Sequence, residues 1–139
     1  MTKQVFKSSI MLGGQTVKTY TANEVCAFSG CFVNYIDAGD LCNCLGLPPN
    51  SERSLSTRLL QAMGAGFEPV VGTHETGGTS VDLTLWRPRD AFTFLVCYAV
   101  QGNKKAWEIL RYLGCFTLEA EIAESIDYEI EGELEVELG

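Results

Sequence analysis

Two arginines and three hydroxyl side chains lie close together in the middle of the sequence: Arg53, Ser54, Ser56, Thr57 and Arg58. A guanidinium group can donate to a phosphate or to a guanine edge, and a hydroxyl can hydrogen-bond to a phosphate oxygen. Further cations would extend a basic surface if they faced the same way, namely Arg87, Arg89, Lys104, Lys105 and Arg111. This chemistry indicates nucleic-acid binding, although two arginines on a helix are also ordinary solvated residues.

Residues suited to catalysis are few. His74 is the only histidine, and it stands in a glycine-rich stretch far in sequence from any convincing Ser or Cys partner. Asp82 and Asp90 could serve a metal-dependent nuclease, but no lysine follows at close spacing, and a strand-face charge and a helix-terminal charge account for them better. Neither a Walker loop nor a dinucleotide-binding glycine pattern occurs. We therefore expect no enzymatic activity and no cofactor.

The six cysteines lie mostly among apolar residues, as in LCNCL and LVCYAV; they are Cys26, Cys31, Cys42, Cys44, Cys97 and Cys115. In a reducing compartment a free cysteine behaves as a small buried hydrophobe. A structural metal is the alternative, but the CxC spacing of residues 42–44 and the single histidine do not match a zinc site. We expect core cysteines and no bound metal.

The charge is unevenly distributed. Residues 1–115 hold nine acids and all ten bases and sum to +1, whereas residues 116–139 hold nine acids and no base, which gives the net charge of −8. Strong DNA binders are typically basic, so this composition weighs against tight DNA binding. We expect one α+β domain over residues 1–116, followed by an acidic helix and strand extension over 117–139.

Neither a membrane segment nor a signal peptide is indicated. No apolar run approaches the roughly 20 residues needed to cross a bilayer. The first residues, MTKQVFKSS, lack the apolar stretch of a signal peptide. We expect a cytoplasmic protein.

Strands are predicted in the N-terminal part. The β-rich runs 5–12 and 15–21 flank Gly13 and Gly14, which can supply the positive φ angles of a hairpin turn. Two more short strands are predicted at 25–28 and 32–35.

Two helices are predicted next, in the arrangement of a helix-turn-helix. Asp37 can cap a helix over 38–45, and Gly46 can end it. Pro48 and Pro49 form the connection because neither can continue the preceding helix. Ser51 is the predicted N-cap of a helix over 52–63 that carries one apolar stripe, formed by Leu55, Leu59 and Met63.

The remaining elements follow from glycines, prolines and periodicity. Residues 64–79 contain five glycines and predict a loop or a hairpin wing, and 81–86 alternate as a half-buried strand. Pro88 begins a helix that is apolar on nearly every side and should lie at the centre of the core. After Gly102-Asn103, an amphipathic helix is predicted, with Trp107, Leu110 and Leu113 on its inner face.

The C-terminal residues predict a final helix and a strand. The helix begins at Thr117 and carries apolar residues at four-residue spacing. The strand over 133–138 alternates glutamates with apolar residues. An unpaired strand of this kind seeks a partner, which favours a homodimer.

Two segments resemble known proteins. Residues 30–60, GCFVNYIDAGDLCNCLGLPPNSERSLSTRLL, resemble the N-terminal domains of phage antirepressor-type proteins of the Bro-N and KilA-N group, in which a strand and a helix ending in LG precede a turn and a second helix. The C-terminal half is similar to small proteins of photosynthetic bacteria and their phages, on the following residues: Asp90, Phe92, Leu95, Val96, Tyr98, Ala99, Gly102, Asn103, Lys104, Ala106, and Thr117 to Glu119.

The resemblance implies a regulatory, non-enzymatic role in DNA binding, although the basic balance usual in that group is missing here. The leading hypothesis is a phage-type transcription regulator that binds DNA, or a DNA-binding protein, through a helix-turn-helix face. Arg53, Ser54, Thr57 and Arg58 would make the contacts. The alternative is an acidic interaction protein that imitates nucleic acid and inhibits a host or viral nucleic-acid-binding factor, as anti-defence proteins do.

Overall fold

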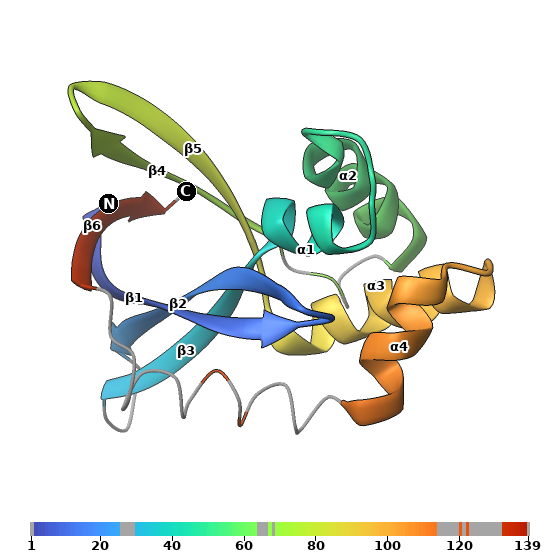
Figure 1. Ribbon diagram of the computed structural model, residues 1–139. Helices are drawn as coiled ribbons and strands as arrows, with labels where there is room; N and C mark the ends of the chain where they lie inside the picture. Colours follow the sequence, from blue (N-terminus) through green and yellow to red (C-terminus); the bar gives the residue numbers. More distant parts are fainter. Residues whose placement is uncertain are drawn as a thin grey trace.

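The computed structural model describes residues 2–25, 30–63, 67, 69–113, 120, 122 and 132–138 (Figure 1). In chain order its elements are β1 (Thr2–Leu12), β2 (Gln15–Val25), β3 (Gly30–Asp37), α1 (Ala38–Cys44), α2 (Ser51–Met63), β4 (Val70–Thr76), β5 (Thr79–Trp86), α3 (Pro88–Val100), α4 (Lys104–Tyr112) and β6 (Gly132–Leu138). The fold class is therefore α+β, as the sequence indicated. None of the described helices combines the length and the apolar character that a membrane span requires.

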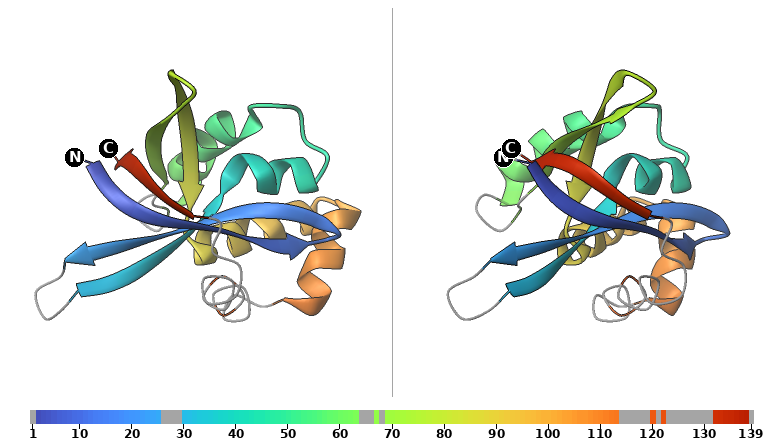
Figure 2. Two further views of the ribbon diagram at one scale, coloured as in Figure 1. Left: turned by 60° about the vertical axis from the view of Figure 1, so that its left-hand side comes forward. Right: turned by 90° about the vertical axis from the view of Figure 1, so that its left-hand side faces the viewer.

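The strands form a closed antiparallel barrel in the order β1-β2-β3-β5-β4-β6. The last strand, β6, pairs with β1 on one side and with β4 on the other. Figures 1 and 2 show β6 beside β1, with the two ends of the chain close together. The predicted strand over 133–138 is therefore present as β6. The prediction that this strand is unpaired was wrong, because β1 and β4 of the same chain pair with its two edges.

Paired glycines make both tight hairpin turns. Gly13 and Gly14 have φ angles of +58° and +81°, and Gly77 and Gly78 have φ angles of +59° and +81°. Two successive positive φ angles give a turn whose twist matches that of the flanking strands. The first hairpin was predicted. The second was expected as a loop or a wing, and its residues 70–76 are a regular strand.

Residues 30–37 form one strand, and the short strand expected at 25–28 lies mostly outside the described residues.

The main core lies where the helices meet the sheet. Its largest fully buried members include Ile36, Leu41, Phe67, Trp86, Phe94 and Leu95. The ring of Trp86 lies 5.9 Å from that of Phe67 and 4.9 Å from that of Phe94. A smaller cluster is formed by strands alone: Tyr20, Ala22, Tyr35, Leu83 and Leu85.

Two helices differ in part from the prediction of which side chains they bury. Helix α3 does not lie at the centre of the core, because Val96 is 37% and Val100 is 77% exposed. In α4 the predicted Leu110 and Leu113 do pack against the core, beside the buried Ala106 and Ile109, whereas Trp107 is 53% exposed and points away from it. Apolar composition alone does not reveal which side of a helix the rest of the chain covers. The final predicted helix lies largely outside the described residues, although Ile122 is helical and fully buried.

Replacing Ser56 tests the contact that holds α2 against this core. Trp86 Nε1 donates to Ser56 Oγ at 2.8 Å, and both residues are buried. Ser56→Ala leaves the indole N–H without this acceptor, so we expect the free energy of unfolding to fall by about 1–3 kcal/mol in urea denaturation. Ser54→Ala is the matched control on the exposed side of the helix and should cost less than about 0.5 kcal/mol. Equal losses in the two variants would contradict the assignment.

Candidate nucleic-acid interface

The turn between α1 and α2 is closed by backbone hydrogen bonds. Leu47 N donates to Cys42 O at 3.1 Å and Gly46 N donates to Asn43 O at 3.0 Å, with Gly46 at φ +74°. This is the helix-ending arrangement that favours glycine. The Asp37 side chain accepts from Asp40 N at 3.1 Å, which confirms the predicted cap of α1.

The start of α2 differs in one detail from the prediction. Ser51 is the first residue of the helix, so it does not stand at the N-cap position. Its hydroxyl donates to Pro48 O at 2.5 Å and closes the connection instead. Asn50, immediately before it, has a φ of +65°, which turns the chain into the helix.

The turn is also tied to α4. Asn103 Nδ2 donates to Leu45 O at 3.2 Å, and Asn103 Oδ1 accepts from Ala106 N at 3.0 Å. One amide side chain therefore caps α4 and anchors the end of α1. The break predicted at Gly102-Asn103 is confirmed, with Gly102 at φ +98°.

The outer side of α2 carries the predicted contact residues. Arg53, Ser54, Thr57 and Arg58 are all exposed, whereas Leu55 and Ser56 between them are buried. Ser54 Oγ donates to Ser51 O at 3.1 Å and Thr57 Oγ1 donates to Arg53 O at 3.2 Å. Because these bonds are exposed, either hydroxyl can rotate toward a ligand without leaving a buried group unsatisfied. The structure thus brings these four residues onto one surface, called the α2 face below.

An ion pair links the α2 face to the neighbouring hairpin. Arg53 Nη2 donates to Asp82 Oδ2, and the two side chains are 62% and 55% exposed. Asp82 belongs to β5, so the contact joins α2 to the β4–β5 hairpin. No local pattern predicts this pair, because its members are separated by 29 residues.

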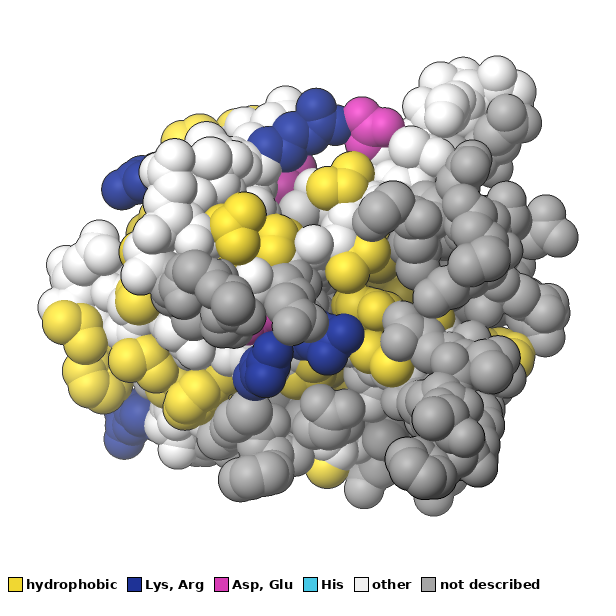
Figure 3. All heavy atoms as spheres, turned by 180° about the vertical axis from the view of Figure 1, so that it is seen from behind, with side chains coloured by type: hydrophobic (Ala, Val, Ile, Leu, Met, Phe, Trp, Pro, Cys, Tyr) yellow, Lys and Arg dark blue, Asp and Glu magenta, His cyan; other side chains and the backbone are white. Residues whose placement is uncertain are grey.

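Four of the other predicted cations stand outside α2, at the starts of the two helices that follow. Arg87 and Arg89 stand at the start of α3, whereas Lys104 and Lys105 stand at the start of α4, beyond the other end of α3. A 13-residue helix separates the two pairs by about 18 Å. Figure 3 shows Lys and Arg side chains at separate places on the face in view, with hydrophobic and uncharged groups between them. The two pairs therefore stand at opposite ends of α3 and do not form one cluster, and the α2 face is the candidate interface.

The carboxylates considered for catalysis lie in different surroundings. Asp82 is exposed and paired with Arg53, whereas Asp90 is 1% exposed in the first turn of α3. His74 stands opposite Val81 in the β4–β5 ladder, and its side chain is outside the description. Within the described ranges, no three His, Cys, Asp or Glu side chains are grouped so that they could hold a metal ion.

A charged cluster fastens α1 to β2. Lys18 Nζ lies 2.9 Å and 2.8 Å from the two oxygens of Asp40, and the Lys18 backbone N–H donates to Asp40 Oδ2 at 2.8 Å. Asp37 is 3.9 Å from the same ammonium group. Burial raises the pKa of the Asp37 carboxyl, and the negative charge of Asp40 raises it further. A Cβ at Gly39 would lie 3.2 Å from Asp37 Oδ1, so this position has little room for a side chain.

The described cysteines divide into buried and exposed thiols. Burial raises the pKa of Cys42 to about 12 and that of Cys44 to about 11, which keeps both thiols neutral. These two confirm the prediction of core cysteines. Cys97 contradicts it, because it lies on the exposed side of α3 next to Val96.

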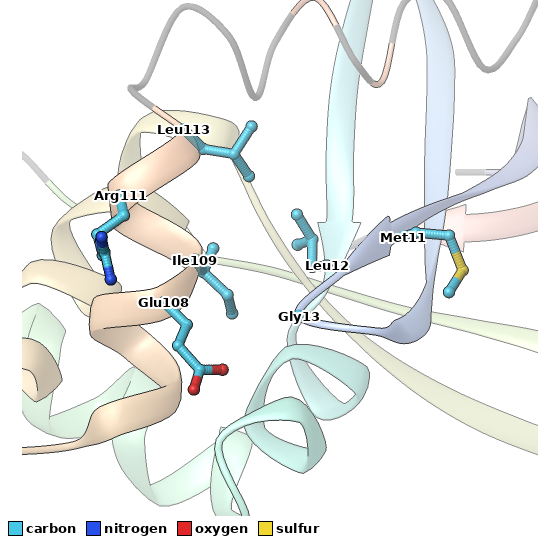
Figure 4. A pocket seen from close by; sticks show the side chains of 7 residues that line it. All are labelled: Met11, Leu12, Gly13, Glu108, Ile109, Arg111 and Leu113. Carbon is cyan, nitrogen blue, oxygen red and sulfur yellow. The ribbon is translucent and has the colours of Figure 1, made fainter.

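A pocket of about 570 Å³ opens between the β1–β2 turn and α4 (Figure 4). Its described lining consists of Met11, Leu12, Gly13, Glu108, Ile109, Arg111 and Leu113. Leu12 and Ile109 form an apolar wall, and the charged groups of Glu108 and Arg111 come from a single helix. These seven residues include no nucleophile with a neighbouring base, so the pocket has no evident catalytic arrangement.

Comparison of the chain with protein-family models, with curated proteins and with solved structures gives no match.

Replacing Asp37 should stabilise the protein in a pH-dependent way. The raised pKa means that the folded state binds this proton more tightly than the unfolded state, so ionisation of Asp37 lowers stability as the pH rises above the ordinary value of 3.8. Asp37→Asn keeps an oxygen for Asp40 N and removes the charge. We expect it to be more stable than the wild type at neutral pH, with the gain disappearing below the ordinary pKa.

The comparison variant for that experiment is Asp37→Ala. It loses the cap and should be less stable than Asp37→Asn by about 0.5–2 kcal/mol across the pH range. Unfolding free energies measured in urea at a series of pH values decide the question. An Asp37→Asn variant that is less stable than the wild type at neutral pH would contradict the proposed balance of charges.

Thiol labelling checks the division of the cysteines. In the folded protein at mildly alkaline pH, iodoacetamide should modify Cys97 while Cys42 and Cys44 stay unmodified, because only a thiolate reacts. Peptide mass mapping measures the result, with urea-unfolded protein as the control in which all three react. If Cys42 were modified as fast as Cys97 in the folded protein, the assignment of Cys42 to the buried core would be wrong.

Proposed function

We propose that this protein is a phage-type regulator that binds double-stranded DNA through the α2 face. The observation that carries this proposal is the arrangement of α2 itself. Its inner side is fixed by Leu55 and by the Ser56–Trp86 hydrogen bond, and its outer side presents two guanidinium groups and two hydroxyls. A rigid helix with such an outer face, following another helix and a turn, can enter a major groove and contact both phosphates and base edges.

The β4–β5 hairpin lies beside the helix and suits a supporting role. Its tip contains Gly77 and Gly78, and Thr79 and Ser80 beside them are exposed. Small polar residues at a hairpin tip can approach the DNA backbone closely and donate to phosphates. We therefore propose that the hairpin acts as a wing that sets the angle of α2 on the duplex.

Electrostatic attraction to DNA would be weak. The first 115 residues sum to a charge of only +1, and one of the two arginines of the α2 face is paired with Asp82. Low affinity per protomer is compatible with regulation if two copies bind together, because linked binding adds effective concentration. A dimer on two half-sites is accordingly part of the proposal.

One observation favours a second candidate function, namely binding to a protein that itself handles DNA. Val96, Val100 and Trp107 leave apolar surface exposed on α3 and α4. Exposed apolar residues grouped on neighbouring elements are common at protein interfaces. If the protein has this second function, the acidic C-terminal segment would imitate nucleic acid for the partner protein.

Arg58→Gln tests the DNA-binding proposal. We expect the variant to bind a fluorescent random-sequence duplex roughly threefold to tenfold more weakly at low ionic strength, because one cation has left the α2 face. The slope of log K against log salt should become shallower by about 0.9. Fluorescence anisotropy titrations at several salt concentrations measure both quantities.

The matched control for this experiment is Arg111→Gln. Arg111 is an exposed cation on α4, outside the α2 face, and its loss changes the net charge equally. It should leave the affinity nearly unchanged. If the wild type fails to bind at low ionic strength, or if the two variants weaken binding equally, the proposed interface is wrong and the protein-partner candidate takes its place.

A further inference from the structure

The partner of Arg53 resembles the ligand that the α2 face would bind. A carboxylate and a DNA phosphate both present an anionic oxygen to a guanidinium group. Asp82 therefore occupies Arg53 in the way a phosphate would, and it does so from the hairpin beside the helix. Both side chains are more than half exposed, so the contact can open without unfolding any element. Arg58 has no acidic partner recorded among the described residues and serves as the internal comparison.

We propose that Asp82 is a specificity-determining residue that competes with DNA phosphate for Arg53. The inference rests on the proposed function. It identifies the Asp82 carboxylate as the group that limits sequence-independent binding to DNA. An Arg53 paired with Asp82 is locally neutral and attracts no phosphate. A phosphate that displaces Asp82 must then tolerate a carboxylate beside it, so backbone contacts at this point are disfavoured on every sequence.

The same pair can read a base pair without being separated. In the major groove a guanine presents acceptors at O6 and N7, and its cytosine presents an amino donor at N4. Arg53 can donate to the guanine while Asp82 accepts from the cytosine. A G·C pair at this position therefore satisfies both side chains, whereas a phosphate satisfies only one. Asp82 thereby weakens binding to arbitrary DNA and favours a G·C pair beneath the N-terminal part of α2.

The test uses the full chain with Asp82→Asn, Arg53→Gln and the two combined. Asp82→Asn keeps the shape and removes the charge. It should bind a short random-sequence duplex roughly threefold to tenfold more tightly, with a salt slope steeper by about 0.9, because Arg53 now reaches a phosphate. Arg53→Gln alone should weaken binding to random sequence, because it leaves the Asp82 carboxylate unpaired beside the DNA. Adding Arg53→Gln to Asp82→Asn should cancel the gain.

Glu108→Gln is the control for net charge. Glu108 is an exposed carboxylate on α4, paired with Lys105 at 3.6 Å and remote from α2 in the sequence. Removing it changes the net charge as Asp82→Asn does but frees no arginine of the α2 face. Thermal denaturation of each variant shows whether the fold is kept, which the exposure of all three residues leads us to expect.

The outcomes separate this inference from the function on which it rests. If the wild type binds and Arg58→Gln weakens it, but Asp82→Asn gains no more than Glu108→Gln, the competition is refuted and DNA binding stands. A gain in Asp82→Asn that survives Arg53→Gln also refutes the competition. If folded wild type and Asp82→Asn both ignore DNA, the proposed function fails first. Selection from a random duplex pool tests the base preference: the wild type should retain a G·C position that Asp82→Asn loses, and identical pools overturn that part.

Discussion

The indole of Trp86 connects the parts of this fold that determine where α2 lies. It is fully buried at the end of β5, its Nε1 donates to Ser56 of α2 at 2.8 Å, and its ring contacts Phe94 of α3. Its backbone pairs with Ile36 at the end of β3, in one of the two short ladders that join the β4–β5 hairpin to the other strands. A buried indole N–H without an acceptor is costly, so α2 has little freedom to rotate or slide. This hydrogen bond, together with the burial of Leu55, therefore determines the direction of the α2 face.

Features governed by neighbouring residues were predictable from the sequence. The glycine pair at 13–14, the cap at Asp37, the stop at Gly46 and the break at Asn103 all depend on backbone angles or on hydrogen bonds within a few residues. The same reasoning located the exposed residues of α2. Ser56 shows its limit: a serine in an amphipathic helix is expected in solvent, and only the position of a tryptophan 30 residues later explains its burial.

The predictions that failed concern which side of a helix the rest of the chain covers. Helix α3 is apolar on nearly every side, yet the barrel and its neighbouring helices cover only part of it, so Val96 and Val100 remain exposed. In α4 the predicted Leu110 and Leu113 contact the core, but the predicted Trp107 does not, and Ala106 and Ile109 are buried instead. The number of basic residues likewise does not reveal that α3 holds Arg87 and Arg89 apart from Lys104 and Lys105. The Arg53–Asp82 contact could not be predicted either, because the net charge of a chain does not show which charged side chains pair with each other.

The closure of the barrel constrains the order in which the protein can be completed. Thr2 pairs with Glu137, so the last ladder joins residues that are 135 positions apart, and β6 also supplies the partner of β4. Until residues 132–138 have left the ribosome, β1 and β4 each present an open edge that another chain could pair with. Contacts of such long sequence separation form slowly. The nascent chain can therefore aggregate through the open edges of β1 and β4 until the acidic strand β6 pairs with both.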